Sequence, residues 1–101
     1  MKLKAPDIEI LKNYFQSKPV LKAYIFGSYA RNEATSKSDI DLLLELDYSQ
    51  KIGLQFIQMK IDIETILKIK VDLVSSNGIS KYMKPIIDKE KKLFYVKNER
   101  G

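Results

Sequence analysis

The sequence predicts an α/β (α+β) fold: a small mixed sheet of about four strands packed against helices. Two observations predict it. Helical and extended patterns alternate along the chain, which is typical of a sheet covered by helices. The chain has 101 residues and 45% hydrophobic residues, enough for one modest core. With neither repeats nor a linker in the sequence, residues 1–101 are expected to form a single domain.

The first helix and first strand are marked by clear stop signals. Ala5-Pro6-Asp7 can open a helix, because proline suits the first turn and acids favour a helix N-terminus. Ser17-Lys18-Pro19 then ends it. Residues 20–26, rich in β-branched and aromatic side chains, are the first expected strand, which ends at Gly27-Ser28. The apolar face of the helix follows helical spacing: Ile8, Leu11, Tyr14 and Phe15.

The middle of the chain repeats the alternation. Residues 29–34 are expected to form a short helix, and residues 35–38 a polar loop. Residues 39–46 are the second strand, and residues 49–68 the longest helix, although Gly53 weakens its first turn. The apolar stripe of this helix is expected to contain Ile52, Phe56, Met59, Ile63, Ile66 and Leu67.

The last third of the chain predicts two further strands. Residues 69–74 are the third expected strand, closed by the turn cluster 75–78. Residues 79–89 favour a helix interrupted at Pro85, where a second short helix can begin. Residues 93–96 are the last expected strand.

Composition limits the available chemistry. The chain has no cysteine and no histidine, which excludes disulfides, thiolate nucleophiles, imidazole bases and the usual zinc sites. No apolar run is long enough for a membrane span and the N-terminus has no apolar signal region, so a cytoplasmic protein is expected. The net charge of +5 can favour anionic partners, or it can simply keep a small protein soluble. No signature of nucleic-acid binding accompanies it, so nucleic acid is not an expected partner.

Three carboxylates alternate with apolar residues in the predicted strands. Side chains alternate faces along a strand, so Asp39 and Asp41 share one face, while Ile40 lies on the other. The third strand repeats the pattern at Asp72. If these two strands are neighbours, the three carboxylates meet on one side of the sheet. Strand order is not visible in the sequence, so this adjacency is an assumption.

Clustered carboxylates favour a cation. Two of them about 5 Å apart repel by roughly 3 kcal/mol at an effective dielectric near 20, so they share a proton or bind a metal ion. An all-oxygen site suits Mg²⁺ or Mn²⁺, and two such ions can clamp the oxygens of a phosphoryl transfer. Gly27-Ser28, at the end of a strand, can hold phosphate at the start of a short helix. Together these features suggest a metal-bound nucleoside triphosphate.

Each feature alone also has a structural interpretation. Gly27-Ser28 is a common turn, and the Asp39-Ile40-Asp41 pattern also fits a surface strand or a helix start capped by Ser38. Asp72 can be the polar face of a strand. Arg31 can contact phosphate or pair with a nearby acid, and pairing is slightly favoured. The functional interpretation therefore depends on the combination.

The combination resembles the signature of the minimal nucleotidyltransferase (MNT) family, within the DNA polymerase β-like superfamily. The matching segments are Gly27-Ser28-Tyr29-Ala30-Arg31 and Ser38-Asp39-Ile40-Asp41-Leu42, and Lys70-Val71-Asp72-Leu73-Val74 resembles the segment with the third acid. The family often has glycine after the arginine, where this chain has Asn32. Asparagine tolerates a left-handed backbone well, so the turn is expected to survive.

The resemblance implies roles for specific residues. Asp39, Asp41 and Asp72 would be the catalytic residues and would bind two Mg²⁺ ions, or Mn²⁺. The nucleotide, ATP, would be bound by Gly27, Ser28, Arg31 and Ser38. A hydroxyl would attack the α-phosphorus and release pyrophosphate. Catalysis would come mostly from positioning and charge neutralisation.

The resemblance also implies a partner. Many MNT proteins resemble antitoxins that bind a HEPN ribonuclease toxin and adenylylate one of its tyrosines, which predicts a hetero-oligomer. A chain of 101 residues has no room for a second domain that grips the acceptor, which favours a partner surface. Two other hypotheses stay open: an antitoxin that acts by binding alone, and a nucleotidyltransferase that modifies a small molecule or an RNA end.

Overall fold

A four-stranded mixed sheet forms the centre of the molecule. The structure, a computed structural model, describes residues 3–97. The strands are β1 (Val20–Phe26), β2 (Ile40–Leu46), β3 (Val71–Ser75) and β4 (Lys92–Val96), in the order β3-β2-β1-β4. β2 and β3 are parallel, whereas β1 is antiparallel to both β2 and β4. The predicted fold class is confirmed, and β2 and β3, which carry the predicted acids, are neighbours.

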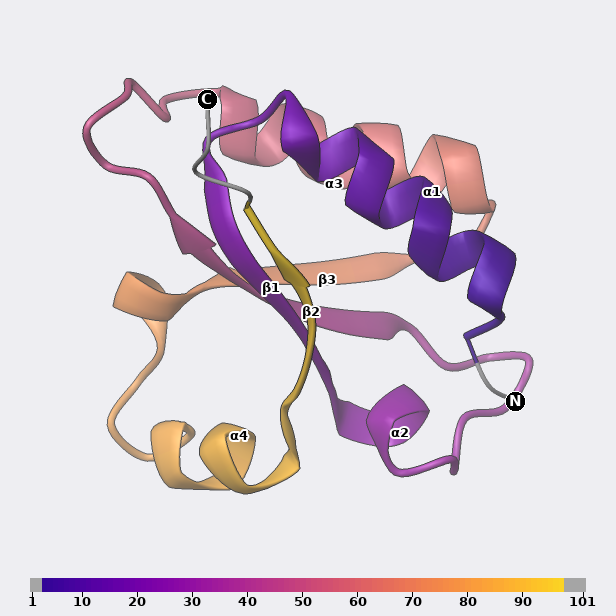
Figure 1. Ribbon diagram of the computed structural model, residues 1–101. Helices are drawn as coiled ribbons and strands as arrows, with labels where there is room; N and C mark the ends of the chain where they lie inside the picture. Colours follow the sequence, from indigo (N-terminus) through magenta and orange to yellow (C-terminus); the bar gives the residue numbers. More distant parts are fainter. Residues whose placement is uncertain (1–2, 98–101) are drawn as a thin grey trace.

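Two long helices cover one face of the sheet. α1 (Ala5–Gln16) and α3 (Gln55–Leu67) lie side by side above it (Figure 1). Because α3 connects β2 to β3, it is the crossover helix that a parallel strand pair requires. The main core lies between these helices and the sheet. Its members from α1 and α3 are Leu11, Phe15, Met59 and Ile63, and its β2 members are Ile40, Leu42, Leu44 and Leu46.

The opposite face of the sheet is covered less completely. The short helices α2 (Gly27–Ala30) and α4 (Lys84–Glu90) lie on this side (Figure 1). A small cluster holds α4 against the sheet through Phe26, Leu43 and Ile87. We call this side the open face. Its incomplete cover leaves room for polar side chains on the sheet.

The short helix after β1 begins earlier than predicted. It occupies Gly27–Ala30, whereas residues 29–34 were expected. Gly27 has φ +73°, so the chain turns into the helix directly at the end of the strand. Asn32 has φ +59°, and this left-handed residue ends the helical turn. The expectation that Asn32 preserves a left-handed turn is confirmed.

The long helix is shorter than predicted. α3 begins at Gln55, not near residue 49, because Asp47 accepts hydrogen bonds from Ser49 and Gln50 in a separate turn. Gly53 follows with φ +46°, a conformation that interrupts a right-handed helix. The predicted stripe is correct at Met59 and Ile63 but wrong at Ile66, which is 45% exposed.

Near the C-terminus, one helix replaces the interrupted helix expected over residues 79–89. α4 starts at Lys84, with Pro85 in its first turn, as expected from the freedom of proline at that position. β3 is followed by a single 3₁₀ turn, Ser76–Gly78, inside the predicted turn. Within residues 3–97, no helix is long and apolar enough to cross a membrane.

Candidate active site

Asp41 and Asp72 are direct neighbours on adjacent parallel strands. They are register partners between β2 and β3. Asp41 is half-buried and Asp72 is exposed, and both lie on the open face because Ile40, Leu42, Val71 and Leu73 are buried on the other. The structure therefore confirms the strand adjacency that the sequence could only assume.

Asp39 lies at the same end of the sheet, one residue before β2 begins. Its carboxylate is exposed. The next residue, Ile40, donates its N–H to the carbonyl oxygen of Lys70 at 2.9 Å. This bond fixes the start of β2 beside the start of β3. Asp39 therefore lies near Lys70, just as Asp41 lies beside Asp72.

The three carboxylates interact electrostatically. Burial, followed by the negative charges of Asp72 and Asp39, raises the pKa of Asp41 to about 6, while the positive charge of Arg31 opposes this shift. The causes are desolvation and like-charge repulsion, which both disfavour ionisation. A positive charge placed beside this carboxyl group would stabilise its ionised form. Functional sites often contain such groups.

The oxygen donors fit a hard divalent cation in their chemistry. Asp41 and Asp72 supply adjacent carboxylates, and a bound cation would relieve the repulsion that raises the pKa of Asp41. Among residues 3–97, however, no three acidic, histidine or cysteine side chains are gathered closely enough to surround a metal ion in this structure. The predicted trio is thus brought to one edge of the sheet without forming a closed cage.

Gly27 makes room for Asp41. A Cβ atom placed on Gly27 would lie 2.1 Å from Oδ2 of Asp41, far inside van der Waals contact. The residue also has φ +73°, a conformation that favours glycine. Phe26 is the register partner of Asp41, so the turn at Gly27 passes directly beside this carboxylate. The predicted glycine is therefore needed for both its backbone angle and its small size.

The two predicted serines occupy different settings. Ser28 is half-buried in α2, next to Gly27. Ser38 closes the loop before β2: its hydroxyl accepts the N–H of Thr35 at 2.9 Å, and its own N–H donates to the Thr35 carbonyl at 3.0 Å. Ser38 is therefore a loop-forming residue in this structure, and it lies directly before Asp39.

Arg31 connects α2 to α4. Its Nε donates to Glu33 at 2.7 Å, and its Nη1 donates to Glu90 at 2.9 Å. Of the two roles that the sequence left open for Arg31, pairing with a nearby acid is present in the structure. Arg31 also lies close enough to Asp41 to lower the pKa of that carboxyl group. Glu90, at the end of α4, was not expected at the site.

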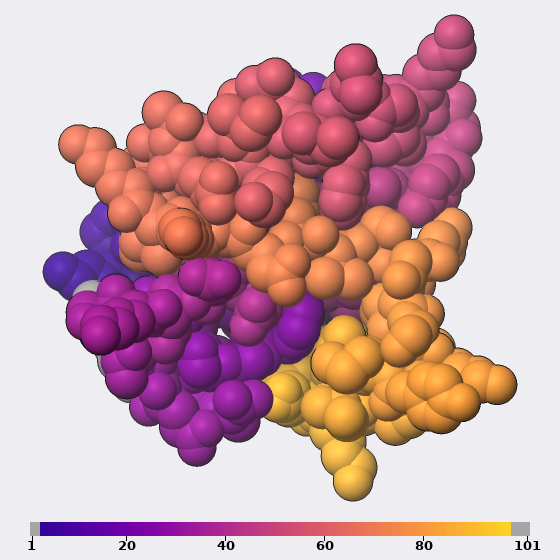
Figure 2. Space-filling view, turned by 180° about the vertical axis from the view of Figure 1, so that it is seen from behind, coloured from indigo at the N-terminus to yellow at the C-terminus, as the bar shows by residue number. Residues whose placement is uncertain are grey.

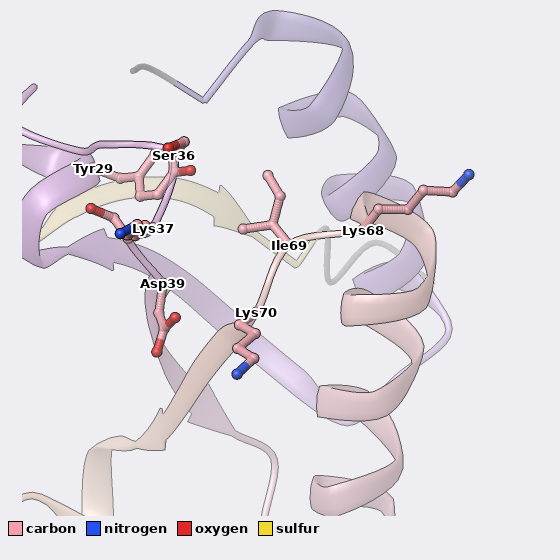
Figure 3. Close-up of a pocket in the computed structure, with 8 residues that line it drawn as sticks. Tyr29, Ser36, Lys37, Asp39, Lys68, Ile69 and Lys70 are labelled. Atoms are coloured by element: carbon pink, nitrogen blue, oxygen red, sulfur yellow. The ribbon is translucent and has the colours of Figure 1, made fainter.

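A lysine-lined cavity lies beside the carboxylates. It has a volume of about 450 Å³, and its lining includes Lys37, Lys68, Lys70 and Asp39 (Figure 3). Figure 2 shows β3, in orange, reaching the surface between α3 above and α4 with β4 below. No local sequence pattern predicts this cavity, because its lysines come from two separate segments, before β2 and before β3.

Comparison with known proteins places the chain in a family. The model of the family described as "Polymerase beta, Nucleotidyltransferase" matches residues 9–100. The chain belongs to this family. It is therefore a nucleotidyltransferase, and the resemblance found in the sequence is confirmed.

Relatives of known sequence support the assignment. A protein of Methanocaldococcus jannaschii named "Putative protein adenylyltransferase" is 43% identical to this chain over 89 residues. The match covers 87% of this chain and 85% of that protein.

Solved structures share the fold. One, named "putative minimal nucleotidyltransferase", is 28% identical with a TM-score of 0.63, and the match covers 86% of this chain and 85% of that one. Another is a complex of the tri-AMPylated HEPN toxin of Shewanella oneidensis with its MNT antitoxin. Its matching chain has a TM-score of 0.70 at 16% identity, and the match covers 93% of this chain and 73% of that chain. At that identity, the second likeness concerns the fold alone.

Proposed function

We propose that this nucleotidyltransferase transfers AMP from ATP to a hydroxyl group of a partner protein. The acceptor is a tyrosine of a HEPN-type ribonuclease toxin, and the chain is the antitoxin of that pair. One observation carries the proposal: the register pairing of Asp41 with Asp72 directly beside Gly27. The names of the relatives support the choice of a protein acceptor and of AMP.

The nucleotide lies on the β1 side of the carboxylates in this proposal. Gly27 and Ser28 hold the triphosphate at the turn where β1 enters the short helix α2, directly beside the carboxylate of Asp41. Arg31 adds positive charge from α2, held in place by Glu90. Ser38 orders the loop before Asp39 through its hydrogen bonds with Thr35 and so positions the carboxylate of Asp39 beside the nucleotide.

Asp39, Asp41 and Asp72 hold Mg²⁺, or Mn²⁺ in its place. When bound, the cations supply charge neutralisation for the phosphates and for the developing transition state. The contribution of the chain is to keep three carboxylates rigidly at one edge of the sheet. The strand pairing of β2 with β3 supplies that rigidity, and positioning of this kind is a large part of catalysis in phosphoryl transfer.

The transfer itself is a displacement at phosphorus. The acceptor oxygen forms a bond to the α-phosphorus, and the bond from that phosphorus to the bridging oxygen breaks, which releases pyrophosphate. Asp72, the outermost carboxylate, lies on the side where the acceptor arrives. Its exposed carboxylate receives the hydroxyl proton. Because the reaction consumes ATP, we place it in the cytoplasm.

A transfer assay tests the proposal. The chain is incubated with ATP labelled at the α-phosphate, Mg²⁺ and the protein encoded by the neighbouring gene. We expect label on a tyrosine of that protein, with none when EDTA replaces Mg²⁺. Absence of label from the protein, under conditions where both ATP and the protein bind, would contradict the proposal.

A second assay separates catalysis from neutralisation by binding. The Asp41→Asn variant keeps the shape of the side chain and removes its charge. We expect it to bind the partner but to transfer no label and to leave the toxin active after the complex is diluted. Full and lasting neutralisation by this variant would favour an antitoxin that acts by binding alone.

A further inference from the structure

The lysine-lined cavity beside Asp39 has the properties of an acceptor-binding subsite. We propose that it binds an acidic segment of the acceptor protein, with carboxylate side chains close to the hydroxyl that is modified. The inference rests on the proposed function and extends it to the chemistry of the acceptor. The cavity has a volume of about 450 Å³, which suits one or two side chains of a docked segment rather than a whole helix.

Two lysines of this cavity, Lys37 and Lys70, form no close ion pair with the residues that the structure describes. Among residues 3–97, no ion pair within 4.0 Å involves Lys37 or Lys70, whereas Lys60, Lys84 and Lys91 each have an acidic partner. Lysines on a protein surface commonly have such partners or project freely into solvent. Two lysines that line one cavity and form no close ion pair within the described part of the chain leave their amines available to an incoming carboxylate.

Of the three lysines that line the cavity, Lys70 is the best placed to contact a carboxylate near Asp39. In Figure 3 its side chain extends in the same direction as that of Asp39, from the strand next to it. Its carbonyl oxygen accepts the N–H of Ile40, which fixes its backbone against β2. The side chain of Lys68, by contrast, extends away from the cavity past α3 (Figure 3). Lys68 therefore contributes to the rim but not to the charge that faces Asp39.

The order of the strands places this charge on the acceptor side. Gly27, at the end of β1, lies on one side of β2, and β3 lies on the other. Lys70 precedes Asp72 by two residues, so both are on the same face of the extended segment. A nucleotide held at Gly27 approaches the carboxylates from β1. The β3 edge is then left for the acceptor.

Electrostatics explains why an acidic acceptor would need these lysines. Asp39, Asp41 and Asp72 lie together at one end of β2 and β3 and repel any approaching carboxylate. Lys37 and Lys70 offset this repulsion at the point of entry. An RNA end would also be attracted to lysines. However, Tyr29, the aromatic residue of the cavity, is only 6% exposed and offers no stacking surface for a base.

A peptide-binding experiment tests the inference without relying on transfer. Two fluorescent peptides are compared, one with a single tyrosine flanked by glutamates and one with the same tyrosine flanked by glutamines. Binding to the chain is measured by anisotropy in Mg²⁺. We expect the wild-type chain to bind the acidic peptide about tenfold more tightly than the neutral one. The Lys37→Gln/Lys70→Gln double variant should lose this preference.

Three controls make the result specific. Lys68→Gln removes the same charge from the rim and should keep the preference, because its amine points away from the cavity. The Lys37→Gln/Lys70→Arg variant keeps a positive charge at position 70. It should therefore recover most of the preference for the acidic peptide that the Lys37→Gln/Lys70→Gln variant loses. Circular dichroism confirms that each variant is folded, and a fluorescent ATP analogue should bind all of them with unchanged affinity.

Several outcomes would overturn the inference. These are equal binding of the two peptides by wild type, an equal loss of preference in Lys68→Gln, or a fall in ATP affinity in the double variant, which would assign the cavity to the nucleotide. Stronger competition by a single-stranded oligoribonucleotide than by the acidic peptide would assign it to RNA. Because these are binding measurements, a wild type that transfers no AMP refutes the proposed function separately.

Discussion

At the scale of single residues, Gly27 has the most stringent requirement. An alanine there combines a φ of +73° with a Cβ only 2.1 Å from Oδ2 of Asp41. The left-handed conformation costs about 1–2 kcal/mol, and the steric overlap adds about 1–3 kcal/mol. We expect Gly27→Ala to lower the free energy of unfolding by about 3 kcal/mol, measured by urea denaturation, and to abolish ATP binding.

Gly53→Ala is the matched control for this prediction. Gly53 also has a positive φ, +46°, but a Cβ there would meet nothing within 4 Å. The Gly53→Ala variant should have a free energy of unfolding lower by about 1–2 kcal/mol because of backbone strain, and it should retain ATP binding. Equal effects of the two substitutions would mean that Gly27 is required for its backbone angle alone.

The raised pKa of Asp41 predicts a pH dependence of stability. The folded chain holds the Asp41 proton more tightly than the unfolded chain does, because its pKa is raised from 3.8 to about 6. Its contribution to stability is therefore fully present below about pH 4, and it is lost as the pH rises to about 6. Asp41→Asn removes this contribution, so the difference in unfolding free energy between wild type and variant should change over that range.

The measurement is a series of urea denaturations between pH 4 and 7 in EDTA. Near neutral pH without a cation, Asp41→Asn should be the more stable protein, because it lacks the repelled charge. Added Mg²⁺ should stabilise the wild type and not the variant. Parallel pH profiles for the two proteins would show that Asp41 is not perturbed in solution.

The sequence singled out the candidate site residues, but it could not predict how they are arranged. Asp41, Asp72 and Gly27 follow from alternation and from a turn after a strand, which are local patterns. The pairing of Asp41 with Asp72 and the contact between Gly27 and Asp41 depend on strand order and register, which no local pattern encodes. Glu90 was missed for the same reason, since it is 59 residues away from Arg31.

At the scale of elements, the ion pair between Arg31 and Glu90 couples α4 to α2. The Glu90 side chain is only 18% exposed, whereas that of Glu33, the other partner of Arg31, is 63% exposed. Glu90→Gln should release Arg31 from α4 and weaken ATP binding several-fold, measured by titration with a fluorescent analogue. Glu33→Gln should have little effect, because exposed pairs contribute little. The reverse order of effects would contradict this role for Glu90.

Two adjacent isoleucines test how α4 is attached to the sheet. Ile87 is 3% exposed and packs with Phe26 and Leu43, whereas Ile86 is 51% exposed. Ile87→Ala should lower the unfolding free energy by about 2–3 kcal/mol. Ile86→Ala should change it by no more than about 0.5 kcal/mol. Thermal and urea denaturation of both variants measure the difference, and equal losses would mean that α4 is oriented differently.

Sequence patterns predicted which elements exist but not always where they begin. α1 is marked by a proline in its first turn, and β1 is marked by a run of β-branched and aromatic residues. Both predicted elements match the structure. The start of α3 was wrong because the turn at Asp47 depends on side-chain hydrogen bonds that compete with the helix. The prediction that Ile66 belongs to the apolar stripe was wrong because helical spacing cannot show where the covered face of α3 ends.

At the scale of the whole molecule, the sheet has its main core on one face and the candidate site on the other. The main core lies under α1 and α3, and the open face has a small cluster under α4. This division leaves the carboxylate edge accessible from the β3 side, where the lysine-lined cavity is found. In the proposed function, this end of the sheet holds the nucleotide and the acceptor protein supplies the rest of the contact surface.

Asp41 and Asp72 are proposed to form the catalytic site of AMP transfer to a protein. The most direct test is intact-mass measurement of the partner protein after incubation with ATP, Mg²⁺ and wild type, Asp41→Asn or Asp72→Asn. We expect the wild type to add AMP to the partner, and both variants, still folded and still bound to it, to add none. Addition of AMP by either variant at the wild-type rate would contradict the claim.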